Sequence, residues 1–174
     1  MNIKSVKTWF ENLELTKPYS IAYETIDSVE NVFVEIELDN GIKGIGSGSP
    51  AEFVTGESID SCKRILKSET KEILGKRNIE DIELICETLK NRWPKNPAAL
   101  TAVDISLYDA LSKLNDIPLA QLLGKVHHSF YTSVTIGIKS IESALEEADD
   151  YVKQGFQILK VKTGSDVSFD IELI

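Results

Sequence analysis

Two lysines separated by one residue, Lys160 and Lys162, have the clearest potential for chemistry in this sequence. Apolar and basic residues alternate from Ile158 onward, a pattern typical of a β-strand whose successive side chains point to opposite faces. Both ammonium groups would then share one face, roughly 7 Å apart. Because two cations at this distance repel each other, either water screens this face or it binds a carboxylate and takes part in proton transfer.

The two lysines belong to a run of alternating strands and helices that begins near residue 130. The hydrophobic periodicity predicts strands over 132–138 and 156–162, and helices over 140–153 and from 169 onward. This order requires parallel strands joined by crossover helices. A closed eight-fold barrel of this kind takes ~250 residues. We therefore interpret the sequence as the front part of a larger protein.

The residues before 130 predict strands first and helices afterwards, which is typical of an α+β domain. Strands are expected over 2–15, 31–38 and 42–46, with a tight turn at Asp39-Asn40-Gly41. The polar residues 16–28 are expected to form a loop. Helices are expected over 58–66, 79–93, 98–114 and 118–124, and Asn96-Pro97 is typical of a helix start.

Three glycines, Gly44, Gly46 and Gly48, occupy alternate positions of the third predicted strand. They lack the strand–turn–helix context of a nucleotide-binding loop. We therefore expect them to allow backbone bending or close packing.

Composition excludes several classes of protein. The chain has 28 acidic and 19 basic residues and a net charge of −9, which argues against general nucleic-acid binding. No signal peptide opens the chain, and no apolar run approaches the ~18 residues of a membrane span. Cys62 and Cys86 lack metal-binding spacing and are expected to be buried free thiols. These features predict a cytoplasmic protein without a nucleic-acid or membrane partner; a homo-oligomer is compatible with them.

The order of these segments resembles the enolase superfamily, and Lys160-Val161-Lys162 resembles the motif that ends the second barrel strand in its muconate lactonizing subgroup. Other similar stretches are Asp39 to Gly46, Thr55-Gly56-Glu57, Ala102 to Leu111 and Leu122-Leu123-Gly124. Thr135-Ile136-Gly137-Ile138 and Leu159 to Gly164 are most similar to dipeptide epimerases of the L-Ala-D/L-Glu type. The resemblance implies an α+β capping domain over 1–130, followed over 131–174 by the first two β/α units of a TIM-type (β/α) barrel.

The resemblance also implies that the complete protein is an isomerase that epimerises the α-carbon of a dipeptide residue. Superfamily sites use a Lys or His base, with Mg²⁺ stabilising the ene-diolate. The resemblance implies that Lys162 is one of two acid/base lysines, and that Lys160 is also catalytic, because it holds the substrate carboxylate and favours the uncharged amine of Lys162. Thr135 would line the substrate pocket, since barrel sites lie at the carboxyl ends of strands.

The metal ligands and the opposing lysine of this family lie on later barrel strands, and we expect them beyond Ile174. Asp166, Asp170 and Glu172 are not expected to bind Mg²⁺. As given, the chain is expected to bind no metal tightly and to be inactive.

Substrate preference is expected to depend on Glu24. In this family the loop after the first strand folds over the substrate, and glutamate-selective relatives carry an arginine there. Alignment of the stretch from Tyr19 to Thr25 puts Glu24 at or near that position. A carboxylate there would repel an acidic substrate side chain and favour a cationic or neutral one. Thr55-Gly56-Glu57 is expected to add to the pocket wall.

Several alternatives stay open. Taken without the resemblance, the two lysines would form a solvated strand face. The same scaffold also carries muconate cycloisomerase and o-succinylbenzoate synthase chemistry, and a truncated, non-catalytic cap module is a third alternative. Four further features are interpreted as structural: His127-His128 as surface residues, Asp104 and Asp109 as helix-packing or hydrogen-bonding groups, and the acidic run over 146–150 as a solvated helix face.

Overall fold

The computed structural model describes residues 1–21, 24–164 and 166–174, which form two compact units. The first unit combines Met1–Leu13 with Val29–Lys125, and the second combines Glu14–Ser28 with Val126–Ile174. These units do not coincide with the domains predicted on either side of residue 130, because residues 14–28 group with the later part of the chain. The predicted boundary stays a prediction. None of the described helices has the length and apolar character that crossing a membrane requires.

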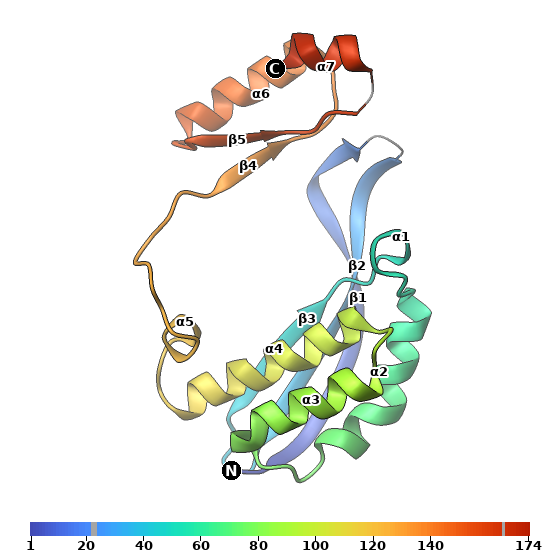
Figure 1. The fold of residues 1–174 in the computed structure, drawn as a ribbon, viewed down its shortest axis with the longest axis vertical. Helices are drawn as coiled ribbons and strands as arrows, with labels where there is room; N and C mark the ends of the chain where they lie inside the picture. The colour runs from blue at the N-terminus through green and yellow to red at the C-terminus, as the bar shows by residue number, and fades with distance from the viewer. Residues whose placement is uncertain (22–23, 165) are drawn as a thin grey trace. The chain divides into compact units, whose positions relative to one another are not determined.

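A three-stranded sheet, in the order β1-β2-β3, begins in the first unit (Figure 1). Its strands are β1 (Ile3–Ile21), β2 (Glu24–Leu38) and β3 (Lys43–Gly48). β2 and β3 pair antiparallel, with Val34 opposite Gly46. The alternation expected for β2 is confirmed, because its even-numbered apolar residues from Val32 to Leu38 are fully buried.

The loop predicted over 16–28 is wrong. β1 continues to Ile21 and β2 starts at Glu24, and the side chains of Ser20 and Thr25 are hydrogen-bonded at 2.8 Å. The prediction relied on the polar residues of this segment and on its proline, Pro18. Proline, which donates no backbone hydrogen bond, is compatible with an edge strand, and β1 is at the edge of the sheet.

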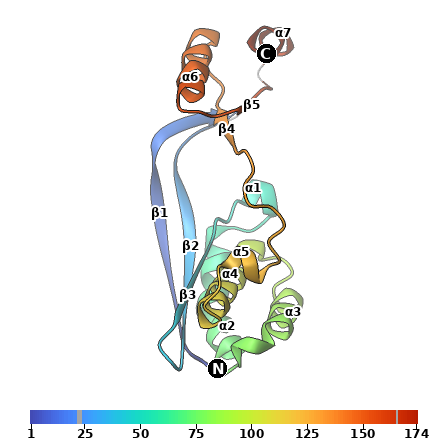
Figure 2. The same ribbon diagram turned by 90° about the vertical axis from the view of Figure 1, so that its left-hand side faces the viewer.

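Helices cover one face of the sheet in the first unit (Figure 2). The covering helices are α2 (Ile59–Leu74), α3 (Ile82–Arg92) and α4 (Pro97–Leu114). The first unit also contains the short helices α1 (Glu52–Thr55) and α5 (Leu119–Leu122) and a 3-10 turn at Ile79–Asp81. The core lies between the inward face of β2 and the apolar faces of α2, α3 and α4. Proline at the first position of α4 confirms the helix start predicted at Asn96-Pro97.

The three alternating glycines of β3 lie directly against the backbone of α4. A Cβ atom would lie 2.1 Å from the Ser106 carbonyl oxygen at Gly44, 2.1 Å from that of Ala102 at Gly46, and 2.2 Å from that of Ala98 at Gly48. These separations are far below van der Waals contact. The expectation of close packing is therefore confirmed.

The second unit contains two parallel strands, β4 (Ser133–Ile136) and β5 (Ile158–Val161). α6 (Ile141–Lys153) and α7 (Val167–Leu173) lie on one face of this strand pair (Figures 1 and 2). The predicted βαβα order is confirmed. The fold class is thus the predicted one, an α+β cap followed by the start of a (β/α) barrel.

Candidate active site

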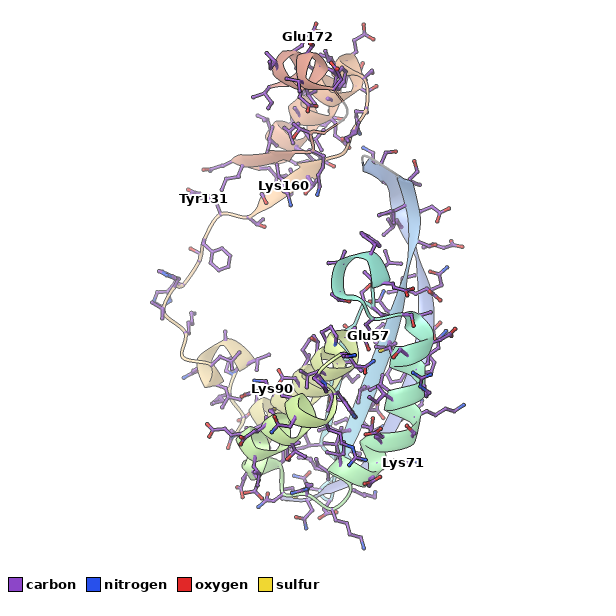
Figure 3. The ribbon with its side chains drawn as sticks, turned by 45° about the vertical axis from the view of Figure 1, so that its right-hand side comes forward. Glu57, Lys71, Lys90, Tyr131, Lys160 and Glu172 are labelled. Atoms are coloured by element: carbon purple, nitrogen blue, oxygen red, sulfur yellow. The ribbon has the colours of Figure 1, made fainter. Side chains whose placement is uncertain are left out.

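Thr135 and Lys160 are direct neighbours across the parallel strand pair. The register places Thr135 opposite Lys160, and both residues are exposed. Their chain neighbours Val134 and Leu159 are half-buried, as expected for residues on the opposite, helix-covered face of the strands. Figure 3 shows Lys160 on the strand pair, away from the helices. Two of the predicted site residues therefore share one face.

Lys162 extends this arrangement past the end of β5. Its backbone N–H donates a hydrogen bond to the carbonyl of Ile136 at 3.0 Å, so the strand pairing continues beyond Val161. Alternation along the strand then places Lys162 on the same face as Lys160. The backbone pairing and this alternation thus put Lys162, Lys160 and Thr135 at the carboxyl end of the strand pair, where β/α barrels carry their sites.

The turn after Lys162 is fixed by α7. The Gly164 N–H donates to the Asp170 carboxylate at 2.8 Å, and Gly164 has a φ of +118°, a conformation that favours glycine. Asp166 caps the start of α7 by accepting from the N–H groups of Ser168 and Phe169. Sequence reasoning missed this role of Asp170, because it depends on the turn conformation rather than on a spacing.

A buried carboxylate lies elsewhere in the second unit, at Glu147 on α6. The acidic run over 146–150 was expected to be solvated, and this is wrong for Glu147, which is 9% exposed. It accepts hydrogen bonds from the ammonium groups of Lys17 and Lys139 and, at 3.1 Å, from the Tyr151 hydroxyl. The other acidic residues of the run, Glu146, Asp149 and Asp150, are exposed as predicted.

The cluster formed by Glu147, Lys17, Lys139 and Tyr151 makes the stability of the chain sensitive to acid. Burial opposes ionisation of this carboxylate, but hydrogen bonds from Lys139, Lys17 and Tyr151 outweigh it and lower the pKa from 4.5 to about 2. Since the pKa is lower in the folded state, the stabilisation is fully present above pH 4.5 and is lost as the pH falls towards 2.

We expect the free energy of unfolding to fall by about 2 kcal/mol between pH 5 and pH 2 through Glu147, after allowing for the exposure of Lys17. Urea unfolding at several pH values measures this. Glu147→Gln should lose this contribution, whereas Glu146→Gln, a change at an exposed position of the same helix, should retain it. Equal pH dependence in both variants would contradict the assignment.

The two cap residues proposed for the substrate pocket have different outcomes. The side chain of Glu24 lies outside the described residues. Glu57, labelled in Figure 3, is only 1% exposed and belongs to the first unit. It accepts from the Ala98 N–H at 2.6 Å and from the Asn96 side chain at 3.0 Å. The carboxylate of Glu57 therefore caps the start of α4, where backbone N–H groups lack helical partners. The expected contribution of Thr55-Gly56-Glu57 to a pocket wall stays a prediction.

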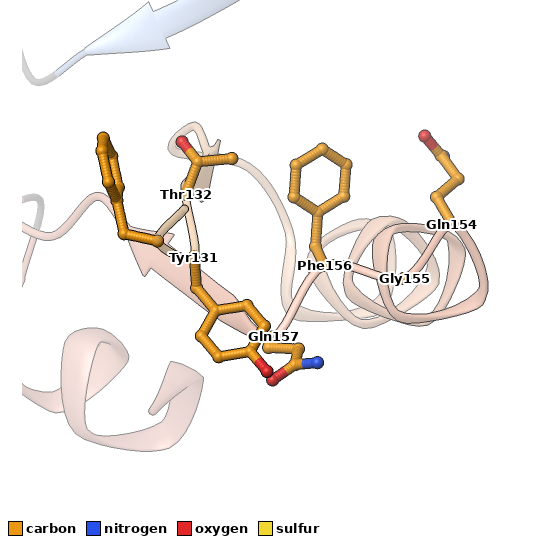
Figure 4. Close-up of a pocket in the computed structure, with 7 residues that line it drawn as sticks. Tyr131, Thr132, Gln154, Gly155, Phe156 and Gln157 are labelled. Carbon is orange, nitrogen blue, oxygen red and sulfur yellow. The ribbon is translucent and has the colours of Figure 1, made fainter. Parts of the chain in front are cut away.

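A hollow of about 280 Å³ in the second unit lies at the other end of the strands (Figure 4). It is lined by residues that precede β4 and β5, namely Phe130, Tyr131, Thr132 and the stretch from Gln154 to Gln157. Lys160 lies near the carboxyl end of β5, and Lys162 follows the strand. This hollow is therefore separate from the candidate active site.

Among the described residues, no three acidic, imidazole or thiol groups come together as metal ligands. His127 and His128 are exposed, as predicted.

Cys62 and Cys86 are buried free thiols, as the sequence predicted. Burial, together with a hydrogen bond to Asp104, raises the pKa of Cys86 to about 12, so this thiol is inert near neutral pH.

Residues 3–124 match the family model described as mandelate racemase / muconate lactonizing enzyme, N-terminal domain. The chain belongs to this family. Its predicted place in the enolase superfamily is thereby confirmed. This family contains relatives that resemble the chain beyond the capping domain, over almost its entire length.

Three relatives show how the similarity is distributed. The chain is 49% identical over 174 residues to the L-Lys-D/L-Arg epimerase of Desulforapulum autotrophicum, covering 49% of that protein. A crystal structure of the dipeptide epimerase from Methylococcus capsulatus, complexed with Mg and dipeptide L-Arg-D-Lys, is 38% identical with a TM-score of 0.95, over 99% of this chain and 49% of that one. The substrate-liganded L-Ala-D/L-Glu epimerase of Bacillus subtilis is 33% identical, with a TM-score of 0.93, over 99% and 48%. The chain thus spans about half the length of the curated relatives it matches.

Proposed function

We propose that the full-length protein is an isomerase that epimerises the α-carbon of a residue in a dipeptide. The observation that carries this proposal is the grouping of Lys162, Lys160 and Thr135 at the carboxyl end of β4 and β5. The names of the most similar relatives, which are dipeptide epimerases, support it.

In this proposal the two lysines have separate roles. Lys162, at the end of the strand pair, removes the α-proton or returns it. Lys160 lies beside Thr135 and holds the substrate carboxylate through charge-assisted hydrogen bonds. Transfer of a proton on the opposite face of the substrate requires a second acid/base group, which we assign to the rest of the full-length protein.

Magnesium is part of the proposal for the full-length protein only. Two solved dipeptide epimerases are described as complexed with Mg and a dipeptide. The described residues of this chain do not provide a set of ligands that fits the ion. Its ligands are therefore expected elsewhere in the full-length protein, and no role assigned to Lys160 or Lys162 depends on it.

We further propose that the preferred dipeptides carry a cationic side chain. Glu24 is the residue proposed to select them, because a carboxylate attracts a lysine or arginine side chain and repels a glutamate. The name of the relative with 49% identity, an L-Lys-D/L-Arg epimerase, supports the same charge preference.

Incubation of the full-length protein with dipeptides in D₂O tests both parts of this proposal. We expect deuterium at the α-carbon, with kcat/KM for Lys- and Arg-containing dipeptides at least about ten-fold above that for L-Ala-L-Glu. Glu24→Gln should reduce this ratio with little effect on apolar dipeptides. Failure to exchange the α-proton of any dipeptide would disprove the epimerase, whereas a preference for L-Ala-L-Glu would disprove only the role of Glu24.

A further inference from the structure

We propose that Lys17 and Glu147 are positioning residues, which together hold the end of β1 (residues 14–21) against the β4–α6 segment. By holding the end of β1, the ion pair also positions the start of β2, which is hydrogen-bonded to it. We infer that this positioning increases the affinity for the substrate. The link to substrate affinity rests on the proposed function. The docking of β1 is independent of it.

The end of β1 has a backbone contact with the carboxyl end of β4. The Ile138 N–H donates to the Ser20 carbonyl at 3.1 Å, and Ile138 lies two residues beyond the last residue of β4. This is the end of the strand that carries Thr135. Residues 14–21 and the candidate site are therefore connected through a single short segment of the second unit.

The Lys17–Glu147 ion pair provides a second attachment, three residues before Ser20. Its two members differ strongly in exposure, since the side chain of Lys17 is 66% exposed and that of Glu147 is 9% exposed. Lys139 and Tyr151 also donate to the Glu147 carboxylate and orient it. Glu147 is thus a preformed acceptor on α6, and Lys17 is the part that can leave it.

Removal of Lys17 should release β1 without unfolding α6. The Glu147 carboxylate would keep its hydrogen bonds from Lys139 and Tyr151, so it would not become an unpaired buried charge. The negative charges of Glu147 and Asp150 both favour the Lys17 ammonium. An ion pair with one exposed member contributes little net free energy, which makes the attachment reversible and sensitive to salt.

The attachment extends to the residue proposed to select the substrate. Ser20 and Thr25 are joined by a side-chain hydrogen bond at 2.8 Å, which connects the end of β1 to the start of β2. Thr25 directly follows Glu24 in the sequence. A ligand that contacts the start of β2 should therefore bind more tightly when the end of β1 is held in place, because less ordering remains to be done on binding.

Lys17→Met in the full-length protein tests the proposal, with Lys4→Met as the matched control. Lys4 is also on β1, but it lies in the first unit and forms an ion pair with Glu37 of β2 at 2.7 Å. Hydrogen–deuterium exchange of the 14–21 amides should be about five-fold faster in Lys17→Met, and unchanged in the 141–153 amides of α6. Lys17→Arg should restore slow exchange, and 0.5 M salt should accelerate exchange in the unmodified protein.

Kinetics supply the second readout. Lys17→Met should raise KM for the dipeptide about five-fold and change kcat less than about two-fold, because the acid/base lysines are untouched. Unchanged exchange in Lys17→Met, or an equal increase in Lys4→Met, would overturn the docking role. Faster exchange with unchanged KM would overturn the link to the substrate. If no dipeptide is turned over by any form, the proposed function fails, while the exchange data still test the docking.

Discussion

Lys162→Met in the full-length protein is expected to lower the rate of α-proton exchange by about 10³-fold, the size of a general acid–base contribution. Methionine is similar to lysine in length but neither accepts nor donates the proton. Lys162 occupies the end of the paired strands, and its backbone is fixed by Ile136, so the substitution should leave the fold intact. Deuterium incorporation into the substrate, followed by NMR, measures the effect directly.

Lys153→Met is the matched control for this experiment. Lys153 is an exposed lysine in the last turn of α6 that forms a surface ion pair with Asp150 at 3.6 Å. Its replacement should leave the exchange rate within about two-fold. A Lys162→Met protein that retains a tenth or more of the exchange activity would exclude Lys162 as the acid/base group.

Gly46→Ala is expected to lower the free energy of unfolding by about 3 kcal/mol, near the upper end of the range for overpacked positions. The added methyl group would lie 2.1 Å from the carbonyl oxygen of Ala102 and 2.5 Å from the backbone nitrogen of Ser106. Both atoms belong to the helical backbone of α4, which a rotamer change does not displace. β3 and α4 would have to separate along a buried contact.

Urea unfolding followed by circular dichroism measures this change. Ser47→Ala is the control, because residue 47 is adjacent in β3 but points to the other, less buried face of the sheet. Its effect should stay within about 0.5 kcal/mol. Equal stability of the Gly46→Ala and unmodified proteins would show that β3 and α4 are not packed as closely as described.

The elements with a regular period were the ones that sequence predicted well. Alternation identified β2, β4 and β5, and the spacing of Gly44, Gly46 and Gly48 predicted backbone bending or close packing, of which the structure shows close packing. Lys160 and Lys162 were placed on one face by the same period of two. These properties depend on nearest neighbours along the chain, so a single sequence contains them.

The features that sequence missed depend on contacts between distant segments. Glu147 lies in a run of acidic residues like its exposed neighbours, but it is buried and accepts from Lys17, which is 130 positions away, as well as from Lys139 and Tyr151. Glu57 was expected, with Thr55 and Gly56, to add to a pocket wall, but it caps a helix that begins 40 residues later. In both cases the sequence around the carboxylate predicts an exposed side chain, whereas the structure shows it buried and hydrogen-bonded to another element.

The capping of α4 by Glu57 has a consequence for how this chain can be varied. The segment over 49–56 is attached at both ends to the same residue: Gly48 packs against Ala98, and Glu57 accepts from the Ala98 N–H. Between these attachments, Phe53 and Val54 are 66% and 68% exposed. Substitutions at these two exposed positions therefore leave the anchors in place. A library of variants at Phe53 and Val54 would change the presented surface while the scaffold stays constant.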